Sequence, residues 1–196
     1  MFSGSTGSGS NDRWLIIGLG NPGDQYSSTR HNIGQMVLHY LANGAKFSPH
    51  KSKMEIADIR VAGRPVVLAK SRGYMNESGA PTRALADFYK VAPDHIIAIH
   101  DELDIAFNTI RLKIGGGDNG HNGLKSLTSH LTTADYFRLR MGIGRPQGPQ
   151  DPADYVLKPF SSAEKKDLPD FVARGANAAE FLIERGLELT QQEFNK

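Results

Sequence analysis

Hydrophobic residues along the chain recur at two spacings, and this pattern predicts strands and helices in turn. The apolar run from Trp14 to Gly18 predicts a buried strand that ends in a glycine-rich turn. The residues from Ile33 to Leu41 place apolar side chains at helical spacing, so a helix should follow. Next come two apolar runs, Met54 to Val61 and Pro65 to Lys70, whose short connection predicts a hairpin.

The same alternation continues toward the C-terminus. A helix is predicted from about Gly79 to Lys90, and the apolar residues from His95 to His100 predict a strand. Two later strands, Thr109 to Ile114 and Tyr136 to Ile143, carry apolar side chains on one face and basic side chains on the other. A short helix between these two strands is predicted by its leucines, which are Leu124, Leu127 and Leu131.

These elements together predict the fold class. A proline- and glycine-rich stretch after Gly144 predicts a loop, and the residues from Phe171 to Ile183 give a final helix one apolar face. Strands that alternate with helices favour helices on both faces of a sheet. We therefore expect a single-domain three-layer α/β/α sandwich with a twisted mixed sheet. The domain should cover residues 12–196, after a linker at residues 1–11 that is rich in Gly, Ser and Thr.

Composition narrows the function classes without naming one. A chain of 196 residues with 39% hydrophobic residues can bury one core without a disulfide or a structural metal. The absence of cysteine excludes a disulfide, a thiolate zinc site and a cysteine nucleophile, and it favours a reducing compartment. No apolar run approaches the ~20 residues of a membrane span and no signal peptide is visible, so we expect a cytoplasmic protein.

Two glycine-rich segments look like nucleotide-binding loops but fail their requirements. Gly18, Gly20 and Gly23 follow a strand with dinucleotide-binding spacing, yet no acidic residue stands about 20 positions further on. The segment from Gly115 to Gly123 lacks the lysine that a P-loop places directly after a glycine. We therefore interpret both segments as turns rather than as NAD or ATP sites.

Metal and covalent serine chemistry have little support. The seven histidines form no close metal-binding pair, and no Gly-x-Ser-x-Gly segment is present. One acidic cluster could in principle bind a cation, but a polar turn after a strand is the preferred interpretation, because hard-cation sites need more oxygen ligands. Its residues are His100, Asp101, Glu102 and Asp104.

The positions of two residues favour catalysis. His31 stands at the predicted start of a helix, and Asp101 follows a strand at its carboxyl end, where open α/β sheets gather their active sites. Each residue alone would more often be structural than catalytic. Three asparagines on predicted loops or element ends could reach the same cleft: Asn21, Asn76 and Asn122, of which the last could equally cap a helix.

Five ordered blocks, taken together, resemble the bacterial peptidyl-tRNA hydrolases from Trp14 to the last helix. The blocks are Gly18-Leu19-Gly20-Asn21-Pro22-Gly23, Thr29-Arg30-His31-Asn32, Tyr74-Met75-Asn76-Glu77-Ser78-Gly79, His100-Asp101-Glu102-Leu103-Asp104 and Gly120-His121-Asn122-Gly123-Leu124-Lys125. The resemblance implies a monomeric enzyme without a metal, a cofactor or an obligate protein partner. Its reaction would be hydrolysis of the ester between a peptide and the 3′ ribose of tRNA, which recycles the tRNA.

The resemblance also implies roles for individual residues. His31 would accept a proton, Asp101 would support its basic role, and Asn21 would help to distinguish blocked from free aminoacyl-tRNA. Substrate-binding positions would be Tyr26, Tyr74, Asn76 and Asn122, and a clamp for the tRNA 5′-phosphate would consist of Lys113 and Arg140.

Two residues depart from the family pattern in the second glycine-rich segment. Asn119 stands where the family usually has glycine, and Asp118 adds a negative charge to the loop. Asparagine tolerates positive φ better than most residues, so the turn should survive. The mobility of this loop and its affinity for RNA are the properties that these departures affect.

A basic segment extends from Thr109 to Pro149 and could bind phosphate without reading sequence. A solvated outer strand face is the competing interpretation. The basic residues of this segment are Arg111, Lys113, Lys125, Arg138, Arg140 and Arg145, against the acidic Asp118 and Asp135.

The expected mechanism needs no covalent intermediate. Neutral His31 would take a proton from water while Asp101 accepts the other ring N–H. The helix N-terminus should lower the pKa of His31 and Asp101 should raise it, which leaves a value near neutrality. An amide N–H of Asn122 or Asn76 could stabilise the oxyanion. The alternatives are a non-catalytic RNA-binding module and an esterase or amidase for small substrates.

Overall fold

The structure is a computed structural model, and it describes residues 11–196. The linker expected at residues 1–11 therefore lies, apart from Asn11, outside the described residues. The side chain of Asn11 donates hydrogen bonds to the carbonyl oxygens of Tyr89 and Lys90. Within the described chain, seven strands form one sheet in the order β2-β3-β4-β1-β5-β7-β6.

Strands and helices follow one another much as the hydrophobic pattern predicts. The strands are β1 (Trp14–Gly18), β2 (Ser48–Pro49), β3 (Met54–Val61), β4 (Arg64–Ser71), β5 (Ile96–Glu102), β6 (Ile110–Ile114) and β7 (Phe137–Gly142). The helices are α1 (Ile33–Ala42), α2 (Gly79–Tyr89), α3 (Asn122–Leu131), α4 (Pro152–Val156), α5 (Glu164–Arg185) and α6 (Leu187–Phe194). Short 3-10 helices are η1 (Arg30–Asn32), η2 (Met75–Glu77) and η3 (Pro93–His95).

The sheet is mixed, as expected. The central strands β4, β1, β5 and β7 run parallel to one another. Strand β3 pairs antiparallel with β4 in the predicted hairpin, and β6 pairs antiparallel with β7. Parallel central strands end at a common edge, so residues that follow β1, β4 and β5 are brought together there.

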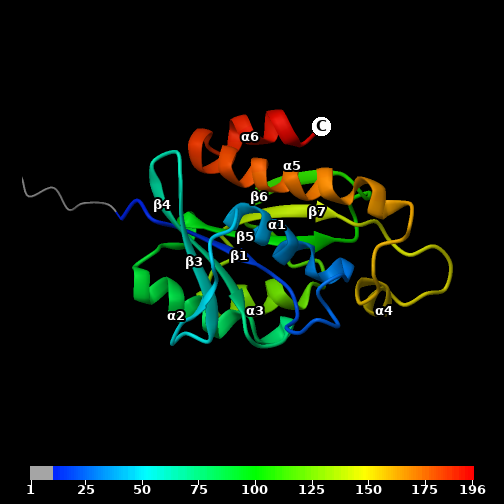
Figure 1. Cartoon of the computed structure of the whole chain (residues 1–196), viewed down its shortest axis with the longest axis horizontal. Helices are drawn as coiled ribbons and strands as arrows, with labels where there is room; N and C mark the ends of the chain where they lie inside the picture. Colours follow the sequence, from blue (N-terminus) through cyan, green and yellow to red (C-terminus); the bar gives the residue numbers. More distant parts are fainter. Residues whose placement is uncertain (1–10) are drawn as a thin grey trace, which may run out of the picture.

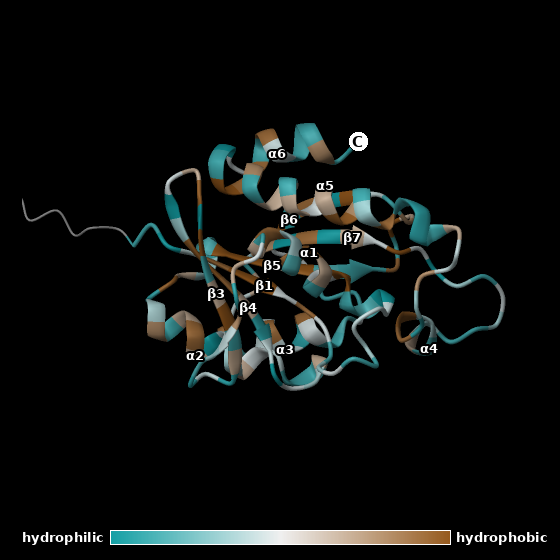
Figure 2. Ribbon diagram, viewed as in Figure 1, coloured by the Kyte–Doolittle hydropathy of each residue, from teal (hydrophilic) through white to brown (hydrophobic). Residues whose placement is uncertain are grey.

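Two apolar cores, one on each face of the sheet, make the molecule three layers thick. Figure 1 shows α5 and α6 on one side of the sheet and α2 and α3 on the other. On the first side Ile16 and Ile97 belong to the same core as Phe171, and on the second side Leu15 clusters with Leu127. Hydrophobic colour concentrates along the central strands in Figure 2. The α/β/α sandwich predicted from the sequence is confirmed.

A close approach between backbones holds the start of α1 against the end of the sheet. A Cβ on Gly34 would collide with the carbonyl oxygen of Ile99 and would lie 2.9 Å from the backbone of Leu19. Only glycine leaves room for this contact, which places η1 and the beginning of α1 directly over the carboxyl ends of β1 and β5.

The C-terminal part contains more structure than the sequence pattern predicts. The stretch after Gly144, expected to be a loop, includes the short helix α4, whose start is capped by the Asp151 side chain. The helix expected to be the last, α5, is followed by a further helix, α6, and Gly186 (φ +83°) separates the two. Residues of α6 cover the edge strand β6, because Gln191 donates to the carbonyl oxygen of Leu112. Among the described residues, no helix is long and apolar enough to cross a membrane.

Candidate active site

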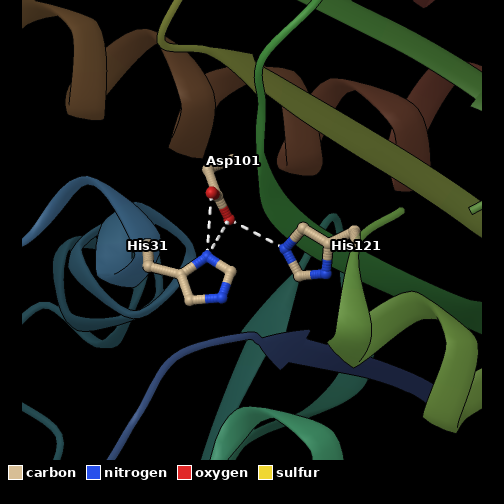
Figure 3. A group of neighbouring side chains, drawn as sticks. All are labelled: His31, Asp101 and His121. Carbon is tan, nitrogen blue, oxygen red and sulfur yellow. Dashed lines mark hydrogen bonds and ion pairs between the residues drawn. The ribbon is translucent and has the colours of Figure 1, made fainter. Parts of the chain in front are cut away.

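The central contact of the site joins His31 to Asp101 at the edge where the parallel strands end. His31 lies in η1, directly before α1, and Asp101 lies near the end of β5. Nδ1 of His31 is 2.9 Å from Oδ2 and 3.0 Å from Oδ1 of Asp101 (Figure 3). An ionised carboxylate can only accept, so Nδ1 carries the proton and Nε2 is left as the basic nitrogen of a neutral ring.

Burial and the ion pair act in opposite directions on both partners. Burial lowers the pKa of His31, but the charge and hydrogen bond of Asp101 outweigh burial, so the pKa of His31 is raised above 6.5. Burial would likewise raise the pKa of Asp101, yet His31 and His121 together hold it below its usual range. Asp101 therefore remains a buried anion. From the sequence we expect Asp101 to raise the pKa of His31 and the helix N-terminus to lower it. In the structure, the effect that opposes Asp101 is burial.

A second imidazole completes the site. Nε2 of His121 is 2.8 Å from Oδ1 of Asp101, so the carboxylate contacts two histidines (Figure 3). Nδ1 of His121 accepts hydrogen bonds from the backbone N–H groups of Gly123 and Leu124, at 3.1 and 3.3 Å. His121 is thus the N-cap of α3 as well as a neighbour of the His31–Asp101 pair.

Asn21 is held by hydrogen bonds to two other segments. Its backbone N–H donates to Oδ1 of Asn32, and Nδ2 of Asn32 donates back to the carbonyl oxygen of Asn21, both at 2.9 Å. The side-chain oxygen of Asn21 accepts the backbone N–H of Met75 at 2.8 Å. Because the oxygen is occupied, the Nδ2 amino group is the end of Asn21 that is free to donate to a ligand.

These groups line one open cavity of about 710 Å³. Helix α4 and the residue after it supply apolar lining from the other side, through Val156 and Leu157. The cavity thus combines a basic imidazole, amide donors and an apolar wall, which suits a substrate with a hydrolysable carbonyl and a variable side chain. Of the nine site residues expected from the sequence, six line this cavity: Asn21, His31, Tyr74, Asn76, Asp101 and Asn122.

Comparisons with known proteins identify the family. The sequence profile of the peptidyl-tRNA hydrolase family matches residues 15–196. The chain belongs to the peptidyl-tRNA hydrolase family. Two relatives named peptidyl-tRNA hydrolase are those of Rhodococcus erythropolis, 57% identical over 93% of this chain and 97% of the relative, and of Pseudarthrobacter chlorophenolicus, 53% identical over 94% and 96%.

A solved structure agrees with the sequence comparison. The crystal structure of peptidyl-tRNA hydrolase from Acinetobacter baumannii superposes with a TM-score of 0.87 at 33% identity, and the match covers 96% of this chain and 97% of that one. The resemblance drawn from the five sequence blocks is therefore confirmed, and with it the expected class of enzyme, a peptidyl-tRNA hydrolase.

The remaining predicted residues of this peptidyl-tRNA hydrolase lie outside the cavity. The ring of Tyr26 meets the ring of Tyr74 edge to face, with centroids 6.3 Å apart, and so extends the rim formed by Tyr74. Lys113 lies on β6 and Arg140 on the neighbouring strand β7. Burial and the positive charge of Arg140 lower the pKa of Lys113, which indicates two cations close together. Two adjacent cations suit a phosphate group.

The basic surface expected between Thr109 and Pro149 is smaller than the sequence indicates, because Arg138 does not belong to it. Arg138 is only 1% exposed: its guanidinium donates to the carbonyl oxygens of Gly117 and Ala134, and it lies over the Tyr136 ring. It therefore holds the glycine-rich loop rather than facing solvent. The alternation along β7 predicts one exposed basic face, but the glycine-rich loop covers the part that carries Arg138. Arg145 remains on the surface, with its side chain 53% exposed, and forms an ion pair with Asp104.

The side chains of the acidic cluster after His100 face different partners. The fully buried His100 places its Nδ1 2.7 Å from the carbonyl oxygen of Asp101, while the Asp101 side chain contacts His31 and His121. Glu102 accepts a hydrogen bond from Asn119, which holds the positive φ of 50° that the sequence argument requires. Within residues 11–196, one group has metal-ligand spacing: His31, Asp101 and His121.

His121 is the functional-site residue that sequence reasoning missed. It belongs to one of the five blocks that resemble the family, between Gly120 and Asn122, but its position in the sequence does not indicate a contact with Asp101. A histidine directly before a predicted helix is a possible N-cap, and that signal was available. The second contact becomes visible only once α3 is packed against the end of β5.

Proposed function

We propose that this chain hydrolyses peptidyl-tRNA by direct attack of water, with His31 as the general base. The single observation that supports this proposal is the pairing of His31 Nδ1 with the buried carboxylate of Asp101, which leaves Nε2 basic at the cavity. Nε2 takes a proton from water as the oxygen attacks the ester carbonyl carbon. The imidazolium that forms is stabilised by Asp101 and returns the proton to the departing ribose oxygen.

Amide groups are the proposed stabilisers of the oxyanion. Asn76, in η2, and Asn122, the first residue of α3, both line the cavity and do not titrate. An amide donor aimed at the developing charge stabilises the tetrahedral intermediate without a metal. Asn21, whose amino group is free to donate, is proposed to contact the blocked amino end of the substrate. Together these residues account for an ester hydrolase that uses only side chains of its own chain.

The tRNA is proposed to bind from the rim of the cavity to Lys113 on the edge strand β6 and Arg140 on the neighbouring strand β7. Tyr26 and Tyr74 offer ring faces for the terminal bases, and Lys113 with Arg140 takes the 5′-phosphate. Such contacts position the acceptor end without reading sequence. We further infer a monomer that acts in the cytoplasm, since the lack of cysteine fits a reducing compartment.

The test is release of the acyl group from N-acetyl-aminoacyl-tRNA, compared with unblocked aminoacyl-tRNA. Rapid release that prefers the blocked substrate supports the proposal. Tight binding of tRNA without release would support the RNA-binding module instead, and equal rates on short esters regardless of salt would support a small-substrate esterase.

A further inference from the structure

The hydrogen bonds of His121 fix which ring nitrogen faces Asp101. Nδ1 accepts the N–H groups of Gly123 and Leu124 at the start of α3, and a nitrogen that accepts carries no proton. The ring proton therefore sits on Nε2, which donates to Oδ1 of Asp101 at 2.8 Å. The cap of α3 thus directs the Nε2–H of His121 at the carboxylate of Asp101.

Asp101 divides its negative charge between two imidazoles. Its Oδ1 lies 3.0 Å from Nδ1 of His31 and 2.8 Å from Nε2 of His121. The carboxylate is only 4% exposed, so water contributes little to its hydrogen bonding. In such a buried site, a donor on one oxygen offsets part of the field that the carboxylate exerts on its other partner.

We propose that His121 is a positioning residue that orients Asp101 and limits how strongly Asp101 makes His31 hold a proton. The proposal rests on the role of His31 as general base. Asp101 alone would hold the imidazolium of His31 so firmly that less of the neutral base would be present near pH 7. The donor from His121 weakens that hold and keeps the carboxylate directed at His31.

The other charged groups near this pair do not take the place of His121. Arg30 precedes His31 in η1, but its guanidinium is paired with Glu164 of α5 at 3.0 Å. His100 of β5 faces the His121 ring, with centroids 5.1 Å apart, and burial lowers its pKa to about 3, so it is neutral. Three more charged side chains line the cavity: Glu102, Asp118 and Arg145.

The variant His121→Asn separates the two contacts of this side chain. Asparagine is a favoured N-cap, so its oxygen can still accept the N–H groups of α3, while its amino group is too short to reach Asp101. We expect the pKa of His31, measured by NMR titration of its ring in the free enzyme, to rise by about 0.5–1 unit. The acid limb of kcat/KM should move to higher pH by the same amount, which lowers activity three- to tenfold on that limb.

Two further variants serve as controls. His121→Ala removes both contacts, so it should show the same upward shift together with a lower melting temperature. His130→Asn changes an exposed histidine at the other end of α3 and should leave the titration of His31 unchanged. A His31 pKa that stays put or falls in both His121 variants would overturn the proposal. Failure of the general base itself would appear separately, as activity retained by His31→Ala, because the NMR titration needs no turnover.

Discussion

Seventy residues separate His31 from Asp101 along the chain, and their contact depends on where β5 and η1 end. Spacing could place each of them at the functional edge of an α/β sheet, and the family motifs could assign their roles. The hydrogen bond itself, the burial of Asp101 and the second histidine on the same carboxylate depend on packing. For that reason the contact of His121 with Asp101 could not be predicted from the sequence, although His121 lies within a family-like block.

At this scale the pH dependence follows from the sign of one pKa shift. A general base works when deprotonated, and the pKa of His31 is raised by Asp101, so kcat/KM should fall as pH decreases through a value above 6.5. Asp101→Asn removes the charge, which should move this acid limb to lower pH and reduce the plateau by ~10²–10⁴ because the tautomer is no longer fixed. A shift of the acid limb to higher pH in Asp101→Asn would contradict the role assigned to Asp101. The measurement is kcat/KM against pH for both proteins.

Among the elements, the start of α1 positions His31 through one close backbone contact. Gly34→Ala adds a Cβ against the carbonyl oxygen of Ile99, and the strand cannot easily move away. We expect a loss of about 1–3 kcal/mol in the free energy of unfolding, measured by urea denaturation, although alanine favours helix by itself. Tyr40→Ala, at an exposed position of the same helix, is the matched control and should cost less. Equal stability of wild type and Gly34→Ala would show that α1 does not depend on this contact.

Elements with strong periodicity were predictable, and those that depend on tertiary contacts were not. The hairpin of β3 and β4 and the long helix α5 follow from their apolar spacing. Helix α4 has five residues in a proline- and glycine-rich stretch, too few to give a periodic signal. Arg138 looked exposed by alternation alone, and only the fold of the glycine-rich loop over β7 shows that Gly117 accepts its hydrogen bond.

The whole molecule must bind a polyanion although its net charge is only +2. The distribution matters, because Lys113 on β6 and Arg140 on β7 stand together, while Arg138 is buried and Arg145 is paired with Asp104. We therefore expect a modest salt dependence of kcat/KM on tRNA substrates. The slope of log kcat/KM against log salt should reflect the few phosphates that these two cations contact.

Lys113→Ala and Arg140→Ala should each reduce that slope by about 0.7–0.9, and raise KM more than they lower kcat. Lys125→Ala, on the exposed face of α3, is the comparison for a cation outside the proposed clamp. If the salt dependence of kcat/KM has the same slope in all three variants and the wild type, phosphate binding by Lys113 and Arg140 is contradicted.

The account rests on His31 as the base, and one measurement tests that directly. It is the rate of release from N-acetyl-aminoacyl-tRNA by His31→Ala with enzyme in excess over substrate, beside His39→Ala, which changes an exposed histidine of α1. We predict a fall of ~10²–10⁴ for His31→Ala with an unchanged melting profile, and no comparable change for His39→Ala. Near-normal release by a folded His31→Ala enzyme would contradict the account and place the base elsewhere in the cavity.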